Sequence, residues 1–275
     1  QIKEKLGQGG FDFVYKIFNK LDDNYYALKK IILETNNPDS IKVLREVQAL
    51  SKLDHINIIR YNTCWLGYDT HQDIEDNGIF DSDNSVNESI LSLYLYIQME
   101  LCDSTLENYL TNRKSIDNLE NINIFKQICE GLNYIHQNNF IHRDIKPGNI
   151  FFKNRTIKIG DFGLVKKNYN QDSKAILEKN TKHSLDIGTK TYASPEQINN
   201  NFYTNKTDIY SLGIVFLELF CEFKTIMEKV EVLNKVRYND IYPDYINNNL
   251  LKLLRNLIND DPNLRFELKI ILTLD

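Results

Sequence analysis

Cysteine is scarce in this 275-residue chain and shows no functional pattern. The four cysteines lie far apart and form no C-x-x-C pair; they are Cys64, Cys102, Cys129 and Cys221. Neither a zinc site nor a disulfide framework is therefore indicated. We expect reduced thiols that are mostly buried.

Long apolar runs are also missing. No stretch approaches the ~20 apolar residues that a membrane-spanning helix needs. The first residues, QIKEKLGQGG, do not resemble a signal peptide. We therefore expect this segment to be soluble and to make no membrane contact of its own, whereas a fuller chain could carry an anchor or sensor domains.

The chain has no excess of positive charge. It carries 33 Lys and Arg against 38 Asp and Glu, which gives a net charge of −5. Domains that hold nucleic acid through its phosphates usually show a basic excess or a basic face. A nucleic-acid partner is therefore not expected, and a small ligand or a protein surface is the better default.

The glycine-rich stretch LGQGGFDFVYK (residues 6–16) lacks one residue of a phosphate-binding pattern. Gly7 and Gly9 match the first two glycines of G-x-G-x-x-G, but Asp12 occupies the position of the third. A lone glycine run is more often a tight turn than a ligand site. The stretch alone therefore does not distinguish a nucleotide loop from a broken one.

What the chain does have is a β-rich part followed by a helical part. Strand-like runs occur at 13–19, 25–33 and 91–101, with a turn at 20–24 and a helical apolar spacing at 40–52. Residues 69–89 carry seven acidic residues and no lysine or arginine, which indicates a solvated insert. We therefore expect a small β-rich domain with one main helix at 1–102.

The second part has helical periodicity. Ile124, Ile128, Leu132 and Ile135 recur on one helical face, and residues 207–220 are apolar almost all round, as in a helix at the centre of a domain. A larger helical domain is therefore expected at 103–275, and the chain as a whole is assigned to the α+β class.

Two neighbouring stretches carry the chemistry: IHRDIKPGNIFF (141–152) and IKIGDFGLVKK (157–167). An aspartate in a loop is usually a turn former, and GDFG alone could be a bulged strand. Together, at this spacing, the stretches resemble the catalytic loop and the metal-binding triplet of the eukaryotic protein kinases. The resemblance implies a two-lobed kinase fold, with a small β-rich N-lobe and a larger helical C-lobe.

The resemblance assigns roles in phosphoryl transfer to named residues. Asp144 would be the catalytic base, and Asn149 and Asp161 would bind Mg²⁺. Lys146, two residues after Asp144, would contact the transferring phosphate, which favours a serine/threonine kinase over a tyrosine kinase. Lys29 would grip the ATP phosphates and pair with Glu46 on the following helix, while Lys30 is expected to be an exposed strand lysine.

The resemblance also implies an ATP site. Within it, Asp12 is expected to weaken nucleotide binding modestly, because a carboxylate within about 8–10 Å of the phosphates is only partly screened. The remaining ATP-binding candidates are Leu6, Gly7, Gly9, Gly10, Val14, Ala27, Met99, Glu100, Cys102 and Phe151. The glycine-rich stretch is then best interpreted as a working loop with one substitution.

Downstream, GTKTYASPEQ (188–197) resembles the end of a kinase activation segment. Glu196 is expected to pair with Arg265, and Asp208 to hold the catalytic loop through backbone N–H groups. Autophosphorylation is expected at Ser184, with Thr181 as second choice. Thr189 would contact the catalytic residues and could also be phosphorylated.

Several non-catalytic stretches, such as REVQALSKLDHINIIRYNTCWL, resemble the kinases that phosphorylate the α subunit of eukaryotic translation initiation factor 2. That family implies a cytoplasmic domain, docking of the factor on a helix near Glu228, Lys229 and Arg237, and homodimerisation through N-lobes involving Asp22 and Tyr61. Asp22 and Tyr61 could equally be a turn aspartate and a half-buried tyrosine. A serine/threonine kinase with other substrates and a pseudokinase scaffold remain as alternatives.

Overall fold

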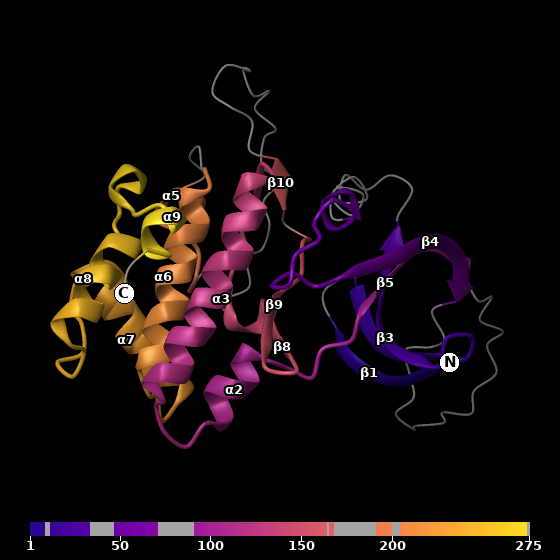
Figure 1. Cartoon of the computed structure of the whole chain (residues 1–275), viewed down its shortest axis with the longest axis horizontal. Helices are drawn as coiled ribbons and strands as arrows, with labels where there is room; N and C mark the ends of the chain where they lie inside the picture. The colour runs from indigo at the N-terminus through magenta and orange to yellow at the C-terminus, as the bar shows by residue number, and fades with distance from the viewer. Residues whose placement is uncertain are drawn as a thin grey trace, which may run out of the picture. The chain divides into compact units, whose positions relative to one another are not determined.

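The computed structural model describes residues 1–8, 12–33, 47–70, 91–163, 165–167, 191–199 and 204–273. The chain divides into two compact units (Figure 1): unit 1 is Gln1–Ser51 with Arg60–Leu101, and unit 2 is Lys52–Ile59 with Cys102–Asp275. The first domain was expected to run unbroken from 1 to 102. Lys52–Ile59 packs with unit 2 instead, because Asn57 and Ile59 exchange backbone hydrogen bonds of 2.8 and 2.9 Å with Ile159.

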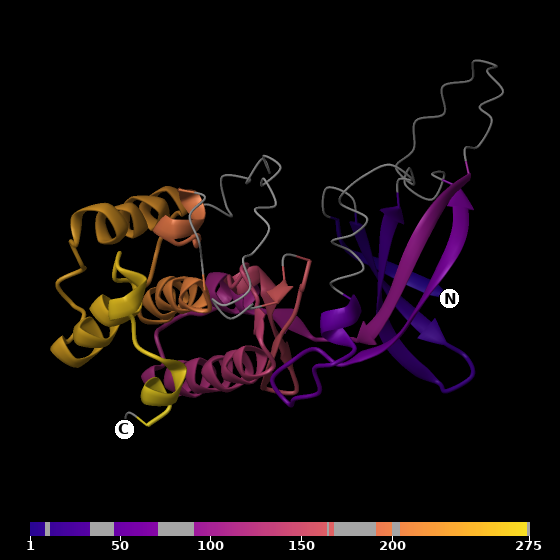
Figure 2. The same ribbon diagram turned by 90° about the horizontal axis from the view of Figure 1, so that it is seen from above.

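Unit 1 is built on one antiparallel sheet, whose strands lie side by side in Figure 2. The strands follow the order β1-β2-β3-β5-β4. Their bounds are β1 Ile2–Gln8, β2 Asp12–Asn19, β3 Asn24–Leu33, β4 Tyr61–Thr70 and β5 Leu91–Glu100. Residues 47–50 are helical, in agreement with the end of the helix expected at 40–52. The acidic insert expected at 69–89 lies, except for its first two residues, outside the described residues.

The two faces of the sheet are set by the alternation of side chains along each strand. Lys30 was expected to be exposed on its strand, but the residue is only 6% exposed. Its Nζ lies 2.8 Å from Oδ2 of Asp69 and 4.3 Å from the ring centroid of Tyr94. Neighbouring lysines on β3 are thus both buried, on opposite faces, which lysine rarely is without a partner.

Unit 2 is mainly helical. Its two central helices, α3 and α6, run side by side in Figures 1 and 2, with the rings of Phe125 and Phe216 4.5 Å apart. The helices are α2 Leu106–Asn112, α3 Asn118–Gln137, α5 Pro195–Ile198, α6 Lys206–Phe220, α7 Ile226–Asn239, α8 Asn248–Leu257 and α9 Leu268–Ile271. Within the described part of unit 2, 3-10 turns lie at Pro147–Asn149 and Pro262–Leu264.

The helical patterns of the sequence are confirmed in unit 2. The four isoleucine and leucine residues expected on one face of α3 are buried, and α6 is buried from Thr207 to Phe220. The ends of α3 follow ordinary capping chemistry, because Asp117 accepts hydrogen bonds from the N–H groups of Leu119 and Glu120. The core of unit 2 therefore forms around α3 and α6.

Short strands of unit 2 lie before α2 and between α3 and α5. β6 Ser104–Thr105, β8 Ile150–Lys153 and β9 Thr156–Ile159 form one small sheet, in the order β6-β8-β9. β7 Phe140–Ile141 pairs with β10 Lys166–Lys167. The segment 142–149 is therefore anchored at both ends, by β7 before it and by β8 after it.

The described residues also bear on the expectations for the cysteines and for membrane-spanning helices. All four cysteines are free thiols; Cys129 and Cys221 are buried, and Cys64 and Cys102 are half-buried. Burial raises the pKa of the Cys221 thiol to about 11. In the part of the chain that is described, none of the helices combines the length and the apolar character needed to cross a bilayer.

Candidate active site

The segment from His142 to Asn149 is held in place by a buried carboxylate. Asp208, on the first turn of α6, accepts hydrogen bonds from the backbone N–H of His142 at 2.9 Å and of Arg143 at 2.7 Å. Its Oδ2 also lies 2.8 Å from Nε2 of His136 on α3. The expectation that Asp208 holds this loop through backbone N–H groups is confirmed.

The same contacts keep Asp208 ionised. Burial alone would raise the pKa of Asp208, but the hydrogen bonds and the charge of its partners, led by His136, outweigh burial and lower it. Because the folded-state pKa lies below the ordinary value, the carboxylate stabilises the fold at neutral pH. That stabilisation is lost as the pH falls through the folded-state pKa.

His142 gives the loop a second anchor. Its buried ring Nε2 lies 3.0 Å from the carbonyl oxygen of Gly160, so this nitrogen carries the proton. Nδ1 then accepts the N–H of Asp144 at 3.3 Å. The peptide of Asp144 is thus tied through one imidazole to the residue that precedes Asp161.

Asp144 lies at the centre of a small polar cluster. Nζ of Lys146 and Nδ2 of Asn149 each donate to Oδ2 of Asp144 at 2.8 Å. Nδ2 of Asn149 also donates to the backbone carbonyl of Asp144 at 2.9 Å. Since both contacts with the carboxylate fall on Oδ2, Oδ1 is left as the oxygen that can accept a further proton donor.

The residues assigned to a metal have suitable donor atoms. The amide nitrogen of Asn149 is engaged by Asp144, which leaves the amide oxygen as the donor atom for a cation. Asp161 adds an exposed carboxylate from a left-handed backbone position, φ 58°. Two oxygen ligands suit a hard divalent cation that completes its shell with phosphates and water. No described group of three or more His, Cys, Asp or Glu forms a metal site without such help.

Gly160 is required by packing next to Asp161. A Cβ at this position would lie 2.3 Å from Cδ1 of Ile59 and 3.0 Å from Cε2 of Phe151. The backbone therefore approaches these side chains more closely than any other residue permits. This close approach fixes the start of the Asp161 turn within unit 2.

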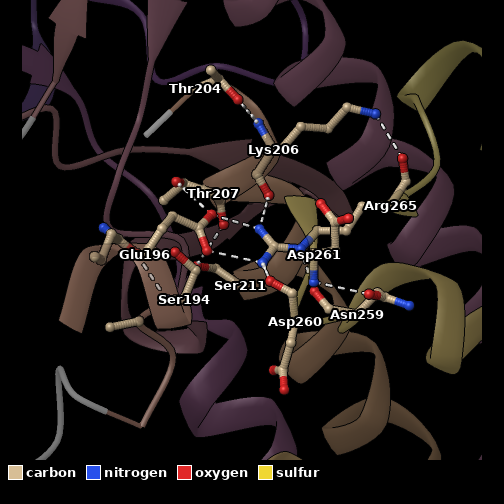
Figure 3. A network of polar contacts seen from close by, with 12 residues as sticks. Ser194, Glu196, Thr204, Lys206, Thr207, Ser211, Asn259, Asp260, Asp261 and Arg265 are labelled. Atoms are coloured by element: carbon tan, nitrogen blue, oxygen red, sulfur yellow. Dashed lines mark hydrogen bonds and ion pairs between the residues drawn. The ribbon is translucent and has the colours of Figure 1, made fainter. Parts of the chain in front are cut away.

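Glu196 and Arg265 form a buried ion pair, shown in Figure 3. Two guanidinium nitrogens of Arg265 donate to the two carboxylate oxygens of Glu196 at 2.6 and 2.9 Å. Arg265 is 2% exposed and also donates to the backbone carbonyls of Lys206 and Asn259. The expected pairing is confirmed, and it connects α5 to the turn before α9.

The pKa of Glu196 responds to this pair. Burial would raise the pKa of Glu196, but the hydrogen bond and the charge of Arg265 outweigh burial and lower it. The Glu196 carboxylate therefore remains ionised at neutral pH. Phe266, where a proline is common after this arginine in kinases, does not disturb the pair.

Two of the residues expected to dock a substrate point into unit 2 instead. Nζ of Lys229 lies 2.7 Å from Oε2 of buried Glu218, and the guanidinium of Arg237 donates to the carbonyls of Thr191 and Ala193 at 2.5 and 2.7 Å. The docking expectation for Lys229 and Arg237 is therefore not supported by their contacts.

Glu218 illustrates why Lys229 turns inward. Burial raises the pKa of Glu218, and the nearby charge of Lys229 offsets this only in part. Tyr192 donates to the same carboxylate at 2.6 Å, and Lys229 donates to the Tyr192 hydroxyl at 3.0 Å. The third docking candidate, Glu228, accepts the N–H of Lys224 at 2.8 Å, and its own N–H donates to the hydroxyl of Thr225, the N-cap of α7.

In unit 1 the strand register gathers several ATP-binding candidates on one face. Gly7 is opposite Val14 and Val14 is opposite Lys29, while Ala27 is opposite Met99. Directly opposed residues of antiparallel strands point to the same face, and positions two apart along one strand share that face. These five candidates therefore lie on the face that carries the Lys29 ammonium.

The remaining candidates for adenine contact are distributed over both units. Leu6 is exposed on β1, whereas Cys102 and Phe151 belong to unit 2 and are half-buried. The backbone N–H of Glu100 donates to the carbonyl of Arg60 at 3.0 Å. The carboxylate of Glu100 in turn accepts the backbone N–H of Arg60 at 2.7 Å. Glu100 is thus fixed at the end of β5 by its own strand neighbours.

Asp22 and Tyr61, the dimer candidates, have contacts within unit 1. Asp22 accepts hydrogen bonds from the side chain of Asn19, the N–H of Asn24 and the hydroxyl of Tyr26. Tyr61 is half-buried; burial, followed by a hydrogen bond with Cys64, raises its pKa to about 12. These contacts agree with the structural alternatives weighed for both residues, and the dimer role stays a prediction.

Six expected functional residues lie outside the described residues. They are two glycines of the phosphate loop, the glutamate expected to pair with Lys29, and the three phosphorylation candidates: Gly9, Gly10, Glu46, Thr181, Ser184 and Thr189.

Sequence reasoning missed two residues that position the catalytic loop. Gln197 accepts the N–H of Ser194 at 3.0 Å and donates to the carbonyl of Arg143 at 3.1 Å, which joins α5 to the loop. The Ser-x-x-Gln spacing is a capping-box pattern and could have revealed Gln197. His136, the partner of Asp208, carries no comparable signal.

Comparison with known families agrees with this geometry. A family model described as the protein kinase domain matches residues 1–274, so the chain belongs to the protein kinase family. Membership confirms the two-lobed α+β fold class and implies ATP and a divalent metal as general requirements.

Several curated relatives are similar to parts or most of this chain. The chain is 36% identical, over 98% of its length, to the interferon-induced, double-stranded RNA-activated protein kinase of Mus musculus, and 35% identical, over 94%, to the eIF-2-alpha kinase GCN2 of Arabidopsis thaliana. It is 42% identical, over 53%, to eukaryotic translation initiation factor 2-alpha kinase 3 of Bos taurus. The chain spans 49%, 23% and 14% of these relatives, respectively.

Proposed function

We propose that the chain is a serine/threonine protein kinase that transfers the γ-phosphate of ATP to a serine of the α subunit of translation initiation factor 2, and so represses translation. The observation that carries this proposal is the Asp144 cluster, with Lys146 and Asn149 on one carboxylate oxygen and a backbone anchored by Asp208. The names of the relatives support the substrate. A cytoplasmic location follows from that substrate.

The chemistry asks for positioning more than for covalent catalysis. Oδ1 of Asp144 would orient the serine hydroxyl and accept its proton as the hydroxyl oxygen attacks the γ-phosphorus and the bond to ADP breaks. Lys146, beside Asp144, would stabilise the charge on the transferring group. Mg²⁺, held by Asn149 and Asp161, would neutralise the phosphate oxygens.

Docking of the initiation factor is proposed on the outer surface of α7. The inward contacts of Lys229 and Arg237 remove these cations from that surface. The first turn of α7 instead presents apolar side chains, since Ile226 and Met227 are 82% and 84% exposed. Through Arg237, the same helix is tied to the segment Thr191–Ala193.

A transfer assay with radiolabelled ATP tests the proposed substrate. We expect label on the initiation factor α subunit and none on its serine-to-alanine variant. Equal labelling of both proteins would contradict the substrate and favour a kinase with other targets. Labelling of neither, together with no transfer to generic basic protein substrates, would favour the scaffold alternative.

Activation is proposed to involve pairing of unit 1 between two copies and autophosphorylation at Ser184 or Thr181. The physical basis is that a phosphate adds about −1.5 to −2 charge and can pair with an arginine, and Arg143 directly precedes Asp144. After incubation with ATP and Mg²⁺ we expect added phosphate by intact-mass analysis and a dimer by sedimentation velocity. Absence of phosphate, or a strict monomer at high concentration, would contradict the respective part.

A further inference from the structure

Asp12 makes a direct ion pair with Lys29. Oδ2 of Asp12 lies 3.1 Å from Nζ of Lys29, and the two side chains are 30% and 7% exposed. The carboxylate that occupies the position of the third loop glycine is therefore in contact with the lysine itself. The sequence predicted that the Asp12 carboxylate lies within about 8–10 Å of the phosphates, but did not indicate its contact with Lys29.

The strand register explains why the two side chains meet. Val14 on β2 is directly opposite Lys29 on β3, and Asp12 is two residues before Val14. Residues two apart on a strand share one face, and diagonal neighbours across an antiparallel pair are within reach of long side chains. Any side chain at position 12 thus lies on the Lys29 face, and a glycine there would place no carboxylate beside Lys29 from this position.

We propose that Asp12 is an affinity-determining residue that competes with the phosphates of ATP for the Lys29 ammonium. This inference rests on the proposed role of Lys29 in binding those phosphates. ATP binding replaces the Asp12–Lys29 contact with a phosphate–Lys29 contact. The displaced carboxylate then faces the negative charge of the nucleotide.

The size of the effect follows from the exposure of the pair. A partly exposed ion pair is weak, so a polyanion with several charges and its metal ion can displace it. The Asp12–Lys29 pair must nevertheless be broken before Lys29 binds phosphate. The affinity for ATP is therefore lower than it would be with a neutral residue at position 12. We expect about a five-fold tighter binding of ATP when the charge is removed, the order of magnitude of one surface ion pair.

Three substitutions separate charge from shape. Asp12→Asn keeps the shape and removes the charge, Asp12→Gly removes the side chain, and Asp12→Glu keeps the charge. Asp23→Asn is the matched control, because Asp23 is an exposed aspartate in the turn that joins β2 to β3. Its φ is 56°, and asparagine tolerates this left-handed backbone. Dissociation constants of ATP and of adenosine are measured for each variant by titration calorimetry, with thermal unfolding as a check of the fold.

The expected result is a gain that depends on phosphate. Asp12→Asn and Asp12→Gly bind ATP about five-fold more tightly, whereas Asp12→Glu and Asp23→Asn bind it like the unsubstituted chain. Adenosine binds all five proteins equally, because it has no phosphates to compete for Lys29. The titration contains no protein substrate, so its outcome is independent of whether initiation factor 2 is the true target.

Three outcomes would overturn the inference. ATP binding that is unchanged in Asp12→Asn would show that the ion pair does not oppose the nucleotide. Weaker ATP binding would assign Asp12 to the nucleotide or its metal ion as a ligand. An equal gain for adenosine and ATP would show that position 12 acts on the shape of the pocket and not on charge.

Discussion

Replacement of Asp144 by asparagine is expected to reduce phosphoryl transfer by at least about 10²-fold, the contribution typical of a positioned general base. The reason lies in the geometry of the carboxylate. Lys146 and Asn149 both donate to Oδ2, and Oδ1 is the acceptor left for the substrate hydroxyl. An asparagine has the same shape but cannot accept a proton from that hydroxyl.

The loss should appear in turnover and leave nucleotide affinity and fold in place. The measurements are kcat with radiolabelled ATP, the dissociation constant of ATP, and the midpoint of thermal unfolding. Asp117→Asn is the matched control, because Asp117 caps α3 and asparagine caps a helix as well as aspartate does. An Asp144→Asn variant that retains kcat within about ten-fold of the unsubstituted chain would contradict the assignment of the base.

Replacement of Arg265 by methionine is expected to destabilise unit 2 by about 3–5 kcal/mol, because breaking a buried ion pair leaves one charge uncompensated. The guanidinium has two contacts with Glu196 and several with backbone carbonyls, all in a buried environment. Glu196, left buried without Arg265, would lose the interactions that lower its pKa.

An exposed ion pair provides the control for this prediction. Lys235 and Glu231 form an i,i+4 pair on α7 with both side chains more than half exposed. Lys235→Met removes the same charge from a solvent-screened surface pair, so it should cost much less stability than Arg265→Met. Urea unfolding of Arg265→Met, Lys235→Met, Glu196→Gln and the double variant Glu196→Gln/Arg265→Met is compared. The double variant should lose less than the sum of the single changes, since the sites are coupled, and equal losses for Arg265→Met and Lys235→Met would refute the prediction.

Much of the candidate site could be predicted because its chemistry restricts residue type at short spacing. Asp144, Lys146 and Asn149 lie within six residues of one another, so their side chains meet through local backbone geometry alone. The roles of Asp208 and Glu196 were also predictable, although their partners are distant in sequence. The resemblance to protein kinases implied these contacts, which helical or strand periodicity does not encode.

The sequence by itself predicted the class of protein, several of the strands and helices, and the residues proposed to carry out phosphoryl transfer. Only the tertiary structure decided which charged side chains are buried. Lys30 was expected to be exposed, and Lys229 and Arg237 were expected to dock a substrate. Lys30 and Arg237 are instead buried against residues far away in sequence, and Lys229 is half-buried beside Glu218. The contact of Asp12 with Lys29 was decided in the same way, since it depends on the register between two strands and not on the loop that contains Asp12. Burial and register are set by the packing of distant segments, and a local pattern carries no information about them.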